Sequence, residues 1–298
     1  MNKEKILIFG AGAVGVFIGT RLKGAGFDVA LYGRKRLHQL SETIQINDEA
    51  KTTLPQKLEV LNVKEFDVIF VTTKLYDLPA ALKEIRKNGI TFNALALTQN
   101  GVISKSMLEG CDADKVVRIA IFEGYAISGN DRIDAQDNIR GWQVEDTVRG
   151  KQIAHILNQS RIKAETNEHL SEIKAEKLII NCAISALSVI KDKTIGGLLH
   201  DPDSRKAVIS LIDETYSVLS LQYHLPSLEK VREETLLQLE NNSSHHPSLY
   251  QDFKQGEKTE IDYFNGQILQ WARESNVQVP ITESVYEQFK RLPNRAGC

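Results

Sequence analysis

The sequence predicts an α/β half with a doubly wound parallel sheet, followed by an all-helical half. Over residues 1–168, short apolar runs alternate with helical patterns. Continuous apolar strands separated by helices are typical of a parallel sheet that is covered on both faces. From residue 169 to residue 298 the apolar residues recur with the period of a helix. We therefore expect two domains, 1–168 and 169–298, which agrees with roughly 150 residues per domain for a chain of 298 residues.

The individual elements follow from their local patterns. Apolar runs predict strands at residues 6–9, 28–32, 66–71, 94–97 and 116–120. A helix is expected at 14–25, immediately after the first strand. Residues 124–145 are polar and rich in turn formers, which predicts turns and short antiparallel strands. The second half predicts a loop at 241–247 and helices at 173–190, 204–221, 228–239 and 259–274.

Charge and cysteine content exclude several classes of protein. The net charge is −2, so there is no bulk attraction to nucleic acid or to an anionic membrane. The three cysteines, Cys111, Cys182 and Cys298, contain no CxxC pair, which argues against a disulfide framework and favours a cytoplasmic protein. No apolar stretch reaches the roughly 20 residues that span a bilayer, and the first one is too short for a signal peptide. His245 and His246 lack a metal-ligand pattern, so no metal is expected.

A glycine-rich loop follows the first predicted strand. Gly10, Gly12 and Gly15 match GxGxxG, with Ala13 and Val14 between the last two glycines. The first glycine permits a tight turn, the second lets a pyrophosphate approach the backbone, and the third lets the helix pack closely on the strand. The free N–H groups at the start of that helix then bind the phosphates. A strand before the motif and a helix after it identify a Rossmann dinucleotide-binding domain, and a glycine turn without a ligand is the alternative.

The end of the second predicted strand indicates which dinucleotide is bound. NAD-binding proteins usually place a carboxylate there, about 20 residues after the glycines, to bond the ribose 2′-hydroxyl. This chain has a run of cations instead, in which Arg34 is the expected contact. A guanidinium is suited to bidentate binding of a phosphate, so we expect NADP(H) as the cofactor. A solvated basic turn is the alternative interpretation.

Further motifs occur in the order found in a known family. Beside GAGAVG at 10–15, they are Thr72-Thr73-Lys74, Gln99-Asn100-Gly101, Lys177-x-x-x-Asn181, Ser248-x-x-x-Asp252, Thr259-Glu260-Ile261-Asp262 and Asn265-Gly266. In this arrangement the sequence resembles the ketopantoate reductases (2-dehydropantoate 2-reductases) over essentially its whole length. The resemblance implies NADPH-dependent reduction of 2-dehydropantoate to pantoate, in pantothenate and coenzyme A biosynthesis.

The resemblance also implies roles for single residues. Lys177 looks like the general acid of the family, and Glu260 looks like its partner carboxylate and a cofactor contact. Lys74 looks like a lysine that binds the cofactor. The positions that resemble substrate contacts are Asn100, which also borders the cofactor, Asn181, Ser185 and Ser248.

The chemistry expected of Lys177 is reasonable without the resemblance. Hydride attack on a ketone builds negative charge on the oxygen, which an ammonium stabilises before it delivers a proton. Desolvation would lower the pKa of such a lysine toward the working pH. Asn181 and Ser185 follow at intervals of four residues, so they share its helical face.

Each of these residues also has a purely structural interpretation. Lys177 could also be a surface lysine whose apolar stem is covered and whose charge stays in water. Thr259 and Glu260 are consistent with a helix N-cap and its acidic first turn, which would place no catalytic role on the carboxylate. Asn100-Gly101 is consistent with a plain turn. Cys182 lies in an apolar helix and is expected to be a buried structural thiol.

Two departures from the family pattern leave the substrate open. Position 185 is a serine where related enzymes often carry a second asparagine, and segment 122–142 contains Glu123, Tyr125 and Trp142 where small residues are usual. A different 2-oxo acid is therefore one alternative. A non-catalytic NADP(H) sensor and a hydroxyacid dehydrogenase of the wider superfamily are two others. The broad apolar stripes of the helical half are also consistent with a homodimer interface.

Overall fold

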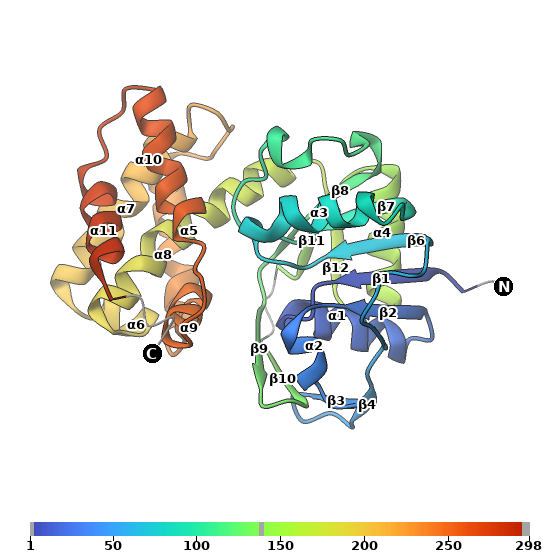
Figure 1. The fold of residues 1–298 in the computed structure, drawn as a ribbon. Helices are drawn as coiled ribbons and strands as arrows, with labels where there is room; N and C mark the ends of the chain where they lie inside the picture. The colour runs from blue at the N-terminus through green and yellow to red at the C-terminus, as the bar shows by residue number, and fades with distance from the viewer. Residues whose placement is uncertain (1–2, 137–139, 294–298) are drawn as a thin grey trace. The chain divides into compact units, whose positions relative to one another are not determined.

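A computed structural model describes residues 3–136 and 140–293 of the chain. The chain divides into two compact units, Met1–Leu170 and Ser171–Cys298, which we call the first and the second unit (Figure 1). Each unit is described by itself below.

The first unit is built on one large sheet with a parallel centre. Neighbouring strands are parallel from β8 to β5, whereas β11 pairs antiparallel with β8 and parallel with β12. In spatial order the strands are β12 (Ala164–Asn167), β11 (Trp142–Glu145), β8 (Val116–Ile121), β7 (Thr91–Leu97), β6 (Glu65–Val71), β1 (Lys5–Phe9), β2 (Asp28–Tyr32) and β5 (Gln56–Leu58). The five strands predicted from apolar runs are all present.

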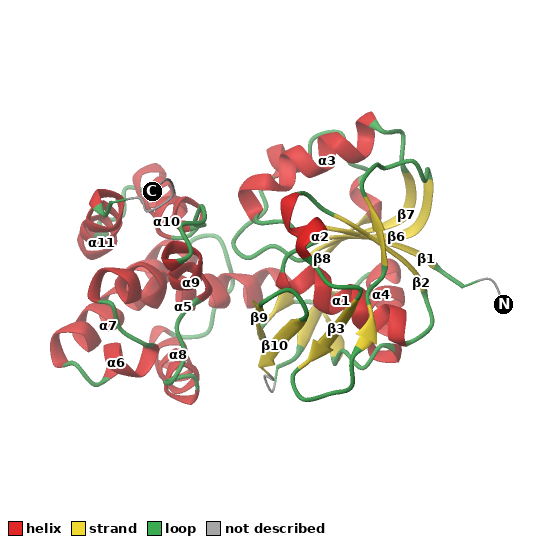
Figure 2. Ribbon diagram, turned by 60° about the horizontal axis from the view of Figure 1, so that its bottom comes forward, coloured by secondary structure: helices red, strands yellow, loops and turns green. Residues whose placement is uncertain are grey.

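Helices cover both faces of this sheet, which explains why its strands are apolar on both sides. The chain steps from β1 to β2 in one direction and from β6 to β7 in the other. Because such crossovers are right-handed, the connecting helices fall on opposite faces. Figure 2 shows α3 (Leu78–Lys87) on one side of the sheet and α1 (Ala13–Gly24) and α4 (Val148–Gln159) on the other. The predicted doubly wound sheet is confirmed.

A second, smaller sheet lies at the edge of the first unit. Its strand order is β4-β3-β10-β9, built from β3 (Thr43–Ile46), β4 (Thr52–Thr53), β9 (Gly124–Ser128) and β10 (Arg132–Gln136). Strands β9 and β10 form the antiparallel hairpin that the polar segment predicted. The end of that segment behaves differently, because β11 joins the large sheet and its Trp142 is fully buried. Residues 137–139 lie outside the described part of the chain. The short helix α2 (Lys35–Gln39) follows β2.

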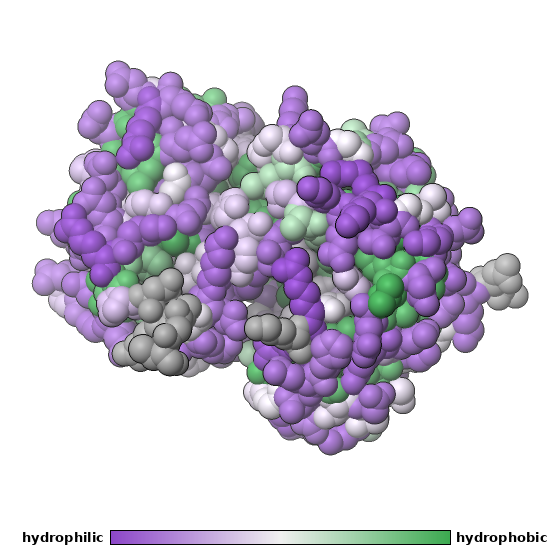
Figure 3. Space-filling view, viewed as in Figure 1, coloured by the Kyte–Doolittle hydropathy of each residue, from purple (hydrophilic) through white to green (hydrophobic). Residues whose placement is uncertain are grey.

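The second unit is helical, as predicted. Its helices are α5 (Leu170–Lys191), α6 (Ile195–Leu199), α7 (Pro202–Leu219), α8 (Leu228–Asn241), α9 (Ser248–Lys254), α10 (Asn265–Glu274) and α11 (Pro280–Arg291). Their outward faces are largely hydrophilic on the side of the molecule that Figure 3 shows. Within the residues that the structure describes, no helix is long and apolar enough to cross a membrane.

The prediction of one helix over 259–274 is wrong. A 3-10 turn at Ile261–Tyr263 precedes α10, and Phe264 between them has φ −106° and ψ −97°, outside the helical range. The interpretation of Thr259 as a helix N-cap is wrong as well, because α10 begins six residues later and has no side-chain cap. The physical reason is that Asn265 turns inward and bonds to α5 rather than continuing the turn before it.

Candidate active site

The predicted cofactor residues of the first unit gather at one edge of the sheet. Carboxyl ends of parallel strands meet at the same edge, and ligands of such sheets bind outside it, where the strand order reverses. Here the reversal lies between β1 and β6. The residues that follow these strands are Gly10 after β1, Arg34 after β2, Lys74 after β6, Asn100 after β7 and Glu123 after β8.

The three glycines of the loop have different surroundings. Gly10 has φ +131°, and a Cβ there would lie 2.6 Å from Thr72 Oγ1. A Cβ on Gly15 would lie 1.9 Å from the Gly10 carbonyl oxygen, so helix α1 approaches the loop too closely for a side chain. A Cβ on Gly12 would meet nothing within 4 Å. Two glycines therefore serve packing, and the third keeps open space in front of the backbone.

That open space lies at the start of α1. Gly12 is the N-cap residue, no side chain caps the helix, and its first turn contains no acidic residue. The backbone N–H groups of Ala13, Val14 and Gly15 come first in the helix and have no intrahelical acceptor. Unfilled donors, a positive helix end and the absence of a competing carboxylate suit a bound pyrophosphate.

Thr72 supports the loop from the neighbouring strand. Its N–H donates to the Phe9 carbonyl at 2.9 Å, and its hydroxyl donates to the Gly10 carbonyl at 2.9 Å. Gln99 holds the next segment by donating from Nε2 to the Val71 carbonyl at 2.8 Å. This role of Thr72 was not predicted from the sequence, although its place directly after β6 could have indicated it.

Arg34 stands exposed at the end of β2, as an anion-binding residue would. Its guanidinium forms no hydrogen bond or ion pair with any residue that the structure describes. Nearby, the Tyr32 hydroxyl donates to the carboxylate of Glu84 from α3. Burial and Glu84 raise the pKa of Tyr32 to about 12, and the Arg34 charge opposes this shift, so the guanidinium lies close to that hydroxyl. The segment after β2 contains no carboxylate of its own, and Glu84 could not be expected beside it because it belongs to α3, about 50 residues later in the chain.

The predicted catalytic residues of the second unit lie on one face of α5. Lys177, Asn181 and Ser185 are spaced by four residues within this regular helix. Ser185 is buried, and the Nδ2 atom of Asn181 is buried without a hydrogen-bond partner in the part of the chain described. A buried donor without an acceptor is rare in folded proteins, and a ligand oxygen would satisfy it.

Glu260 is buried beside this face, with 4% of its surface exposed. Burial lowers the pKa of Lys177 to about 7, and the ammonium of Lys174 lowers it further, whereas the carboxylate of Glu260 opposes both effects. That opposition places Glu260 within electrostatic reach of Lys177. Lys177 is half-buried, so it is not the fully exposed surface lysine of the structural interpretation.

Asn265 ties the segment that carries Glu260 to α5. This asparagine is fully buried, and its Nδ2 donates to the Cys182 carbonyl at 3.1 Å. Because α10 begins at Asn265, the bond fixes the turn that holds Glu260 against the helix of Lys177. Cys182 itself is buried and burial raises its pKa, as expected for a structural thiol.

Ser248 and the paired histidines lie on another segment, at and just before the start of α9. Ser248 is exposed at the start of α9, and its hydroxyl forms no hydrogen bond within the described residues. The His246 ring stacks on Tyr250 with centroids 3.8 Å apart. Across the described ranges, no group of three or more His, Cys, Asp or Glu residues is arranged to hold a metal ion.

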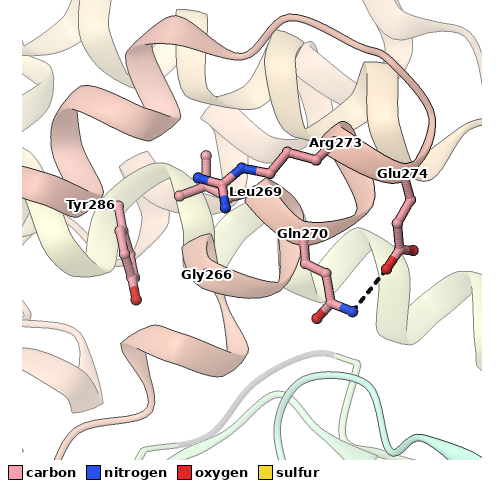
Figure 4. A pocket seen from close by; sticks show the side chains of 6 residues that line it. All are labelled: Gly266, Leu269, Gln270, Arg273, Glu274 and Tyr286. Atoms are coloured by element: carbon pink, nitrogen blue, oxygen red, sulfur yellow. Dashed lines mark hydrogen bonds between the residues drawn. The ribbon is translucent and has the colours of Figure 1, made fainter.

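A shallow surface pocket of the second unit lies elsewhere, between α10 and α11 (Figure 4). Figure 4 shows the Arg273 side chain reaching over Leu269 toward Tyr286, while Gln270 donates to Glu274 at 2.8 Å. Its lining residues are Gly266, Leu269, Gln270, Arg273, Glu274 and Tyr286. None of the predicted site residues lines this pocket.

Comparison with known proteins decides the family. Residues 6–142 match the family model described as "Ketopantoate reductase PanE/ApbA", and residues 169–292 match its C-terminal counterpart. The chain belongs to the ketopantoate reductase family. Its relatives in Vibrio cholerae and Archaeoglobus fulgidus are named as 2-dehydropantoate 2-reductases, which supports the conclusion that this chain is an oxidoreductase.

Individual relatives are distant but extend over the whole chain. A 2-dehydropantoate 2-reductase of Vibrio cholerae is 23% identical over 302 residues, covering 96% of this chain and 97% of its own. A ketopantoate reductase structure from Ralstonia eutropha has a TM-score of 0.86 at 22% identity, covering 96% of this chain and 97% of that one. A D-mandelate dehydrogenase with NADH and anilino(oxo)acetate has a TM-score of 0.85 at 22% identity, with the same coverage. At these identities the two structures establish the shared fold.

Proposed function

We propose that this protein reduces 2-dehydropantoate to pantoate with NADPH, as a step of pantothenate and coenzyme A biosynthesis. The observation that carries the proposal is the desolvated Lys177, which has Asn181 on its own helical face and the buried carboxylate of Glu260 within electrostatic reach. An ammonium in these surroundings is a proton donor suited to neutral pH.

The residues of the first unit fit a dinucleotide. Space in front of Gly12 and the unfilled N–H groups of α1 would hold the pyrophosphate. Exposed Arg34 would hold the 2′-phosphate that distinguishes NADP(H). Lys74 and Asn100, at the ends of β6 and β7, would border the rest of the cofactor. The bound cofactor supplies the hydride.

Residues of the second unit would handle the charge that develops on the substrate. As the ketone carbon is reduced, its oxygen becomes an alkoxide, and the Lys177 ammonium stabilises it and then transfers a proton to it. The unpartnered Nδ2 of Asn181 would donate to a substrate oxygen. Glu260 favours the protonated form of Lys177 and so maintains the acid between turnovers. Ser185 and Ser248 remain proposed substrate contacts.

A second candidate substrate is a 2-oxo acid with a different side chain. It is favoured by Glu123 after β8, whose Oε2 accepts from Trp142 Nε1 at 2.9 Å and from the Tyr125 hydroxyl. The indole N–H also lies 3.0 Å from that hydroxyl. Such a fixed carboxylate at the ligand edge of the sheet favours a substrate with a hydrogen-bond donor.

Two further proposals concern the location of the protein and its assembly. Cys111 and Cys182 are free, which is compatible with a proposed cytoplasmic location. Leu221, Leu237 and Ile281 are exposed apolar side chains of the helical unit, and a homodimer through that unit stays a proposal.

The test is consumption of NADPH in the presence of 2-dehydropantoate, followed by absorbance, with NADH as the comparison. We expect turnover with NADPH, its loss in Lys177→Ala, and weaker NADPH binding in Arg34→Ala. Arg36→Ala is the matched control for the basic turn, because Arg36 is also exposed. Tighter binding of NADH than of NADPH would contradict the cofactor assignment. Tight NADPH binding without turnover of any 2-oxo acid would favour the sensor.

A further inference from the structure

We propose that Lys174 is a positioning residue for the reaction, whose ammonium repels that of Lys177 and so promotes release of the Lys177 proton. The inference rests on the role proposed above for Lys177. Lys174 belongs to none of the motifs that link the chain to its family, and no sequence pattern singled it out.

Helix geometry places the two lysines together. They are three residues apart within α5, so their Cβ atoms lie about 5–6 Å from each other on one face of the helix. Lys174 is one turn before Lys177, on the side opposite to Asn181 along the helix axis. Two ammonium groups at this spacing destabilise each other unless solvent screens them.

Burial removes much of that screening. Only 8% of Lys174 is exposed, although lysine is among the residues least often buried. Like charges interact more strongly in a poorly solvated region than at the surface.

Charged side chains act on Lys177 from two elements. Lys174 on its own helix lowers the pKa of Lys177, in the same direction as burial, and Glu260 at the start of the 3-10 turn before α10 raises it. With these effects combined, the pKa is about 7. Burial has the largest effect, and the Lys174 charge adds to it against Glu260, so the pKa of the proton donor lies close to the pH at which a cell enzyme works.

The proton balance explains the benefit. In the step, an N–H bond of the Lys177 ammonium breaks and an O–H bond forms on the substrate alkoxide, which leaves Lys177 neutral. Repulsion between Lys174 and Lys177 is present before the transfer and absent after it. A neighbouring cation is one of the known ways in which proteins lower the pKa of a functional lysine.

The test measures Lys177 directly and does not depend on turnover. Full-length protein is labelled with a trace of acetic anhydride at a series of pH values, and acetylation of Lys177 is quantified by mass spectrometry. Wild type should give a midpoint near the value of about 7. Lys174→Met keeps the buried stem and removes the charge, so its midpoint should rise by about one pH unit or more.

Two controls separate charge from packing. Lys174→Arg retains the positive charge and should keep the wild-type midpoint. Lys191→Met removes an exposed lysine at the far end of the same helix and should also leave it unchanged. If Lys174→Met fails to fold by circular dichroism, Lys174→Gln provides the same comparison with a polar side chain. The pH at which kcat falls should move with the labelling midpoint.

The outcomes distinguish this inference from the proposed function. An unchanged Lys177 midpoint in the charge-removing variants overturns the role of Lys174, whether or not the protein reduces 2-dehydropantoate. The role of Lys174 is supported if both the labelling midpoint of Lys177 and the pH at which kcat falls are raised in these variants. A raised midpoint in a protein that reduces no 2-oxo acid would overturn the proposed function and leave the repulsion between the two lysines established.

Discussion

Single replacements of Gly12 and Gly15 by alanine should separate cofactor binding from folding. Both glycines belong to the same loop, but a Cβ on Gly12 meets nothing within 4 Å, and one on Gly15 lies 1.9 Å from the Gly10 carbonyl oxygen. Since Cβ atoms do not approach other heavy atoms within 3.0 Å, the Gly15 variant must displace backbone by about 1 Å. Gly12→Ala requires no displacement.

The magnitudes follow from this difference. Overpacking of a tight site costs about 1–3 kcal/mol. In a unit of this size about 2 kcal/mol corresponds to a fall in Tm of roughly 4–8 °C, which we expect for Gly15→Ala. Gly12→Ala changes only an N-cap residue and should cost about 0.5 kcal/mol, or ~1–2 °C. Its methyl group displaces the pyrophosphate from the N–H groups of α1, so NADPH affinity should fall by about 100-fold.

Differential scanning fluorimetry without ligand gives the two Tm values, and titration of NADPH fluorescence gives the two Kd values. Wild-type protein and Gly24→Ala provide the references, because a Cβ on Gly24 lies outside the loop and makes only an ordinary contact, 3.7 Å from Thr52 Cγ2. The reasoning would be refuted by wild-type NADPH affinity in Gly12→Ala. It would also be refuted by equal thermal destabilisation of the two loop variants.

Three further changes test the rest of the site. Thr72→Val removes the 2.9 Å hydrogen bond to the Gly10 carbonyl. The free energy of unfolding, measured in urea, should fall by about 1 kcal/mol, and NADPH should bind more weakly. Unchanged values of both would show that the bond is dispensable. The rate constant kcat should fall as pH rises through about 7, where Lys177 loses its proton, and a flat profile to pH 9 would argue against this acid. The pKa of Lys177 is lower in the folded protein than in the unfolded chain, so burial of its charge destabilises the protein most below pH 7. Lys177→Met removes that charge and should therefore raise Tm more at pH 6 than at pH 9. Asn265→Leu deletes the bond to the Cys182 carbonyl and should lower kcat by displacing Glu260, while NADPH affinity falls far less than in Gly12→Ala, which NADPH titration checks.

The helical half illustrates where local patterns were sufficient and where they failed. Periodicity predicted the long helix of Lys177, Asn181 and Ser185, and α5 carries all three on one face. The same reasoning joined Thr259 to α10, because apolar spacing continues across the break. The break depends on the bond from Asn265 to a carbonyl on another helix, which no local pattern contains.

Local sequence patterns were enough to predict the Rossmann sheet, the glycine loop and the register of the α5 residues. These features depend on residues a few positions apart, whose spacing fixes backbone geometry directly. The bonds of Thr72 to Gly10 and of Tyr32 to Glu84, and the burial of Lys174, became visible only in the folded chain. Hydrogen bonds across many residues and loss of solvent around a charge arise when distant segments pack together, so their partners cannot be inferred from neighbours in the chain.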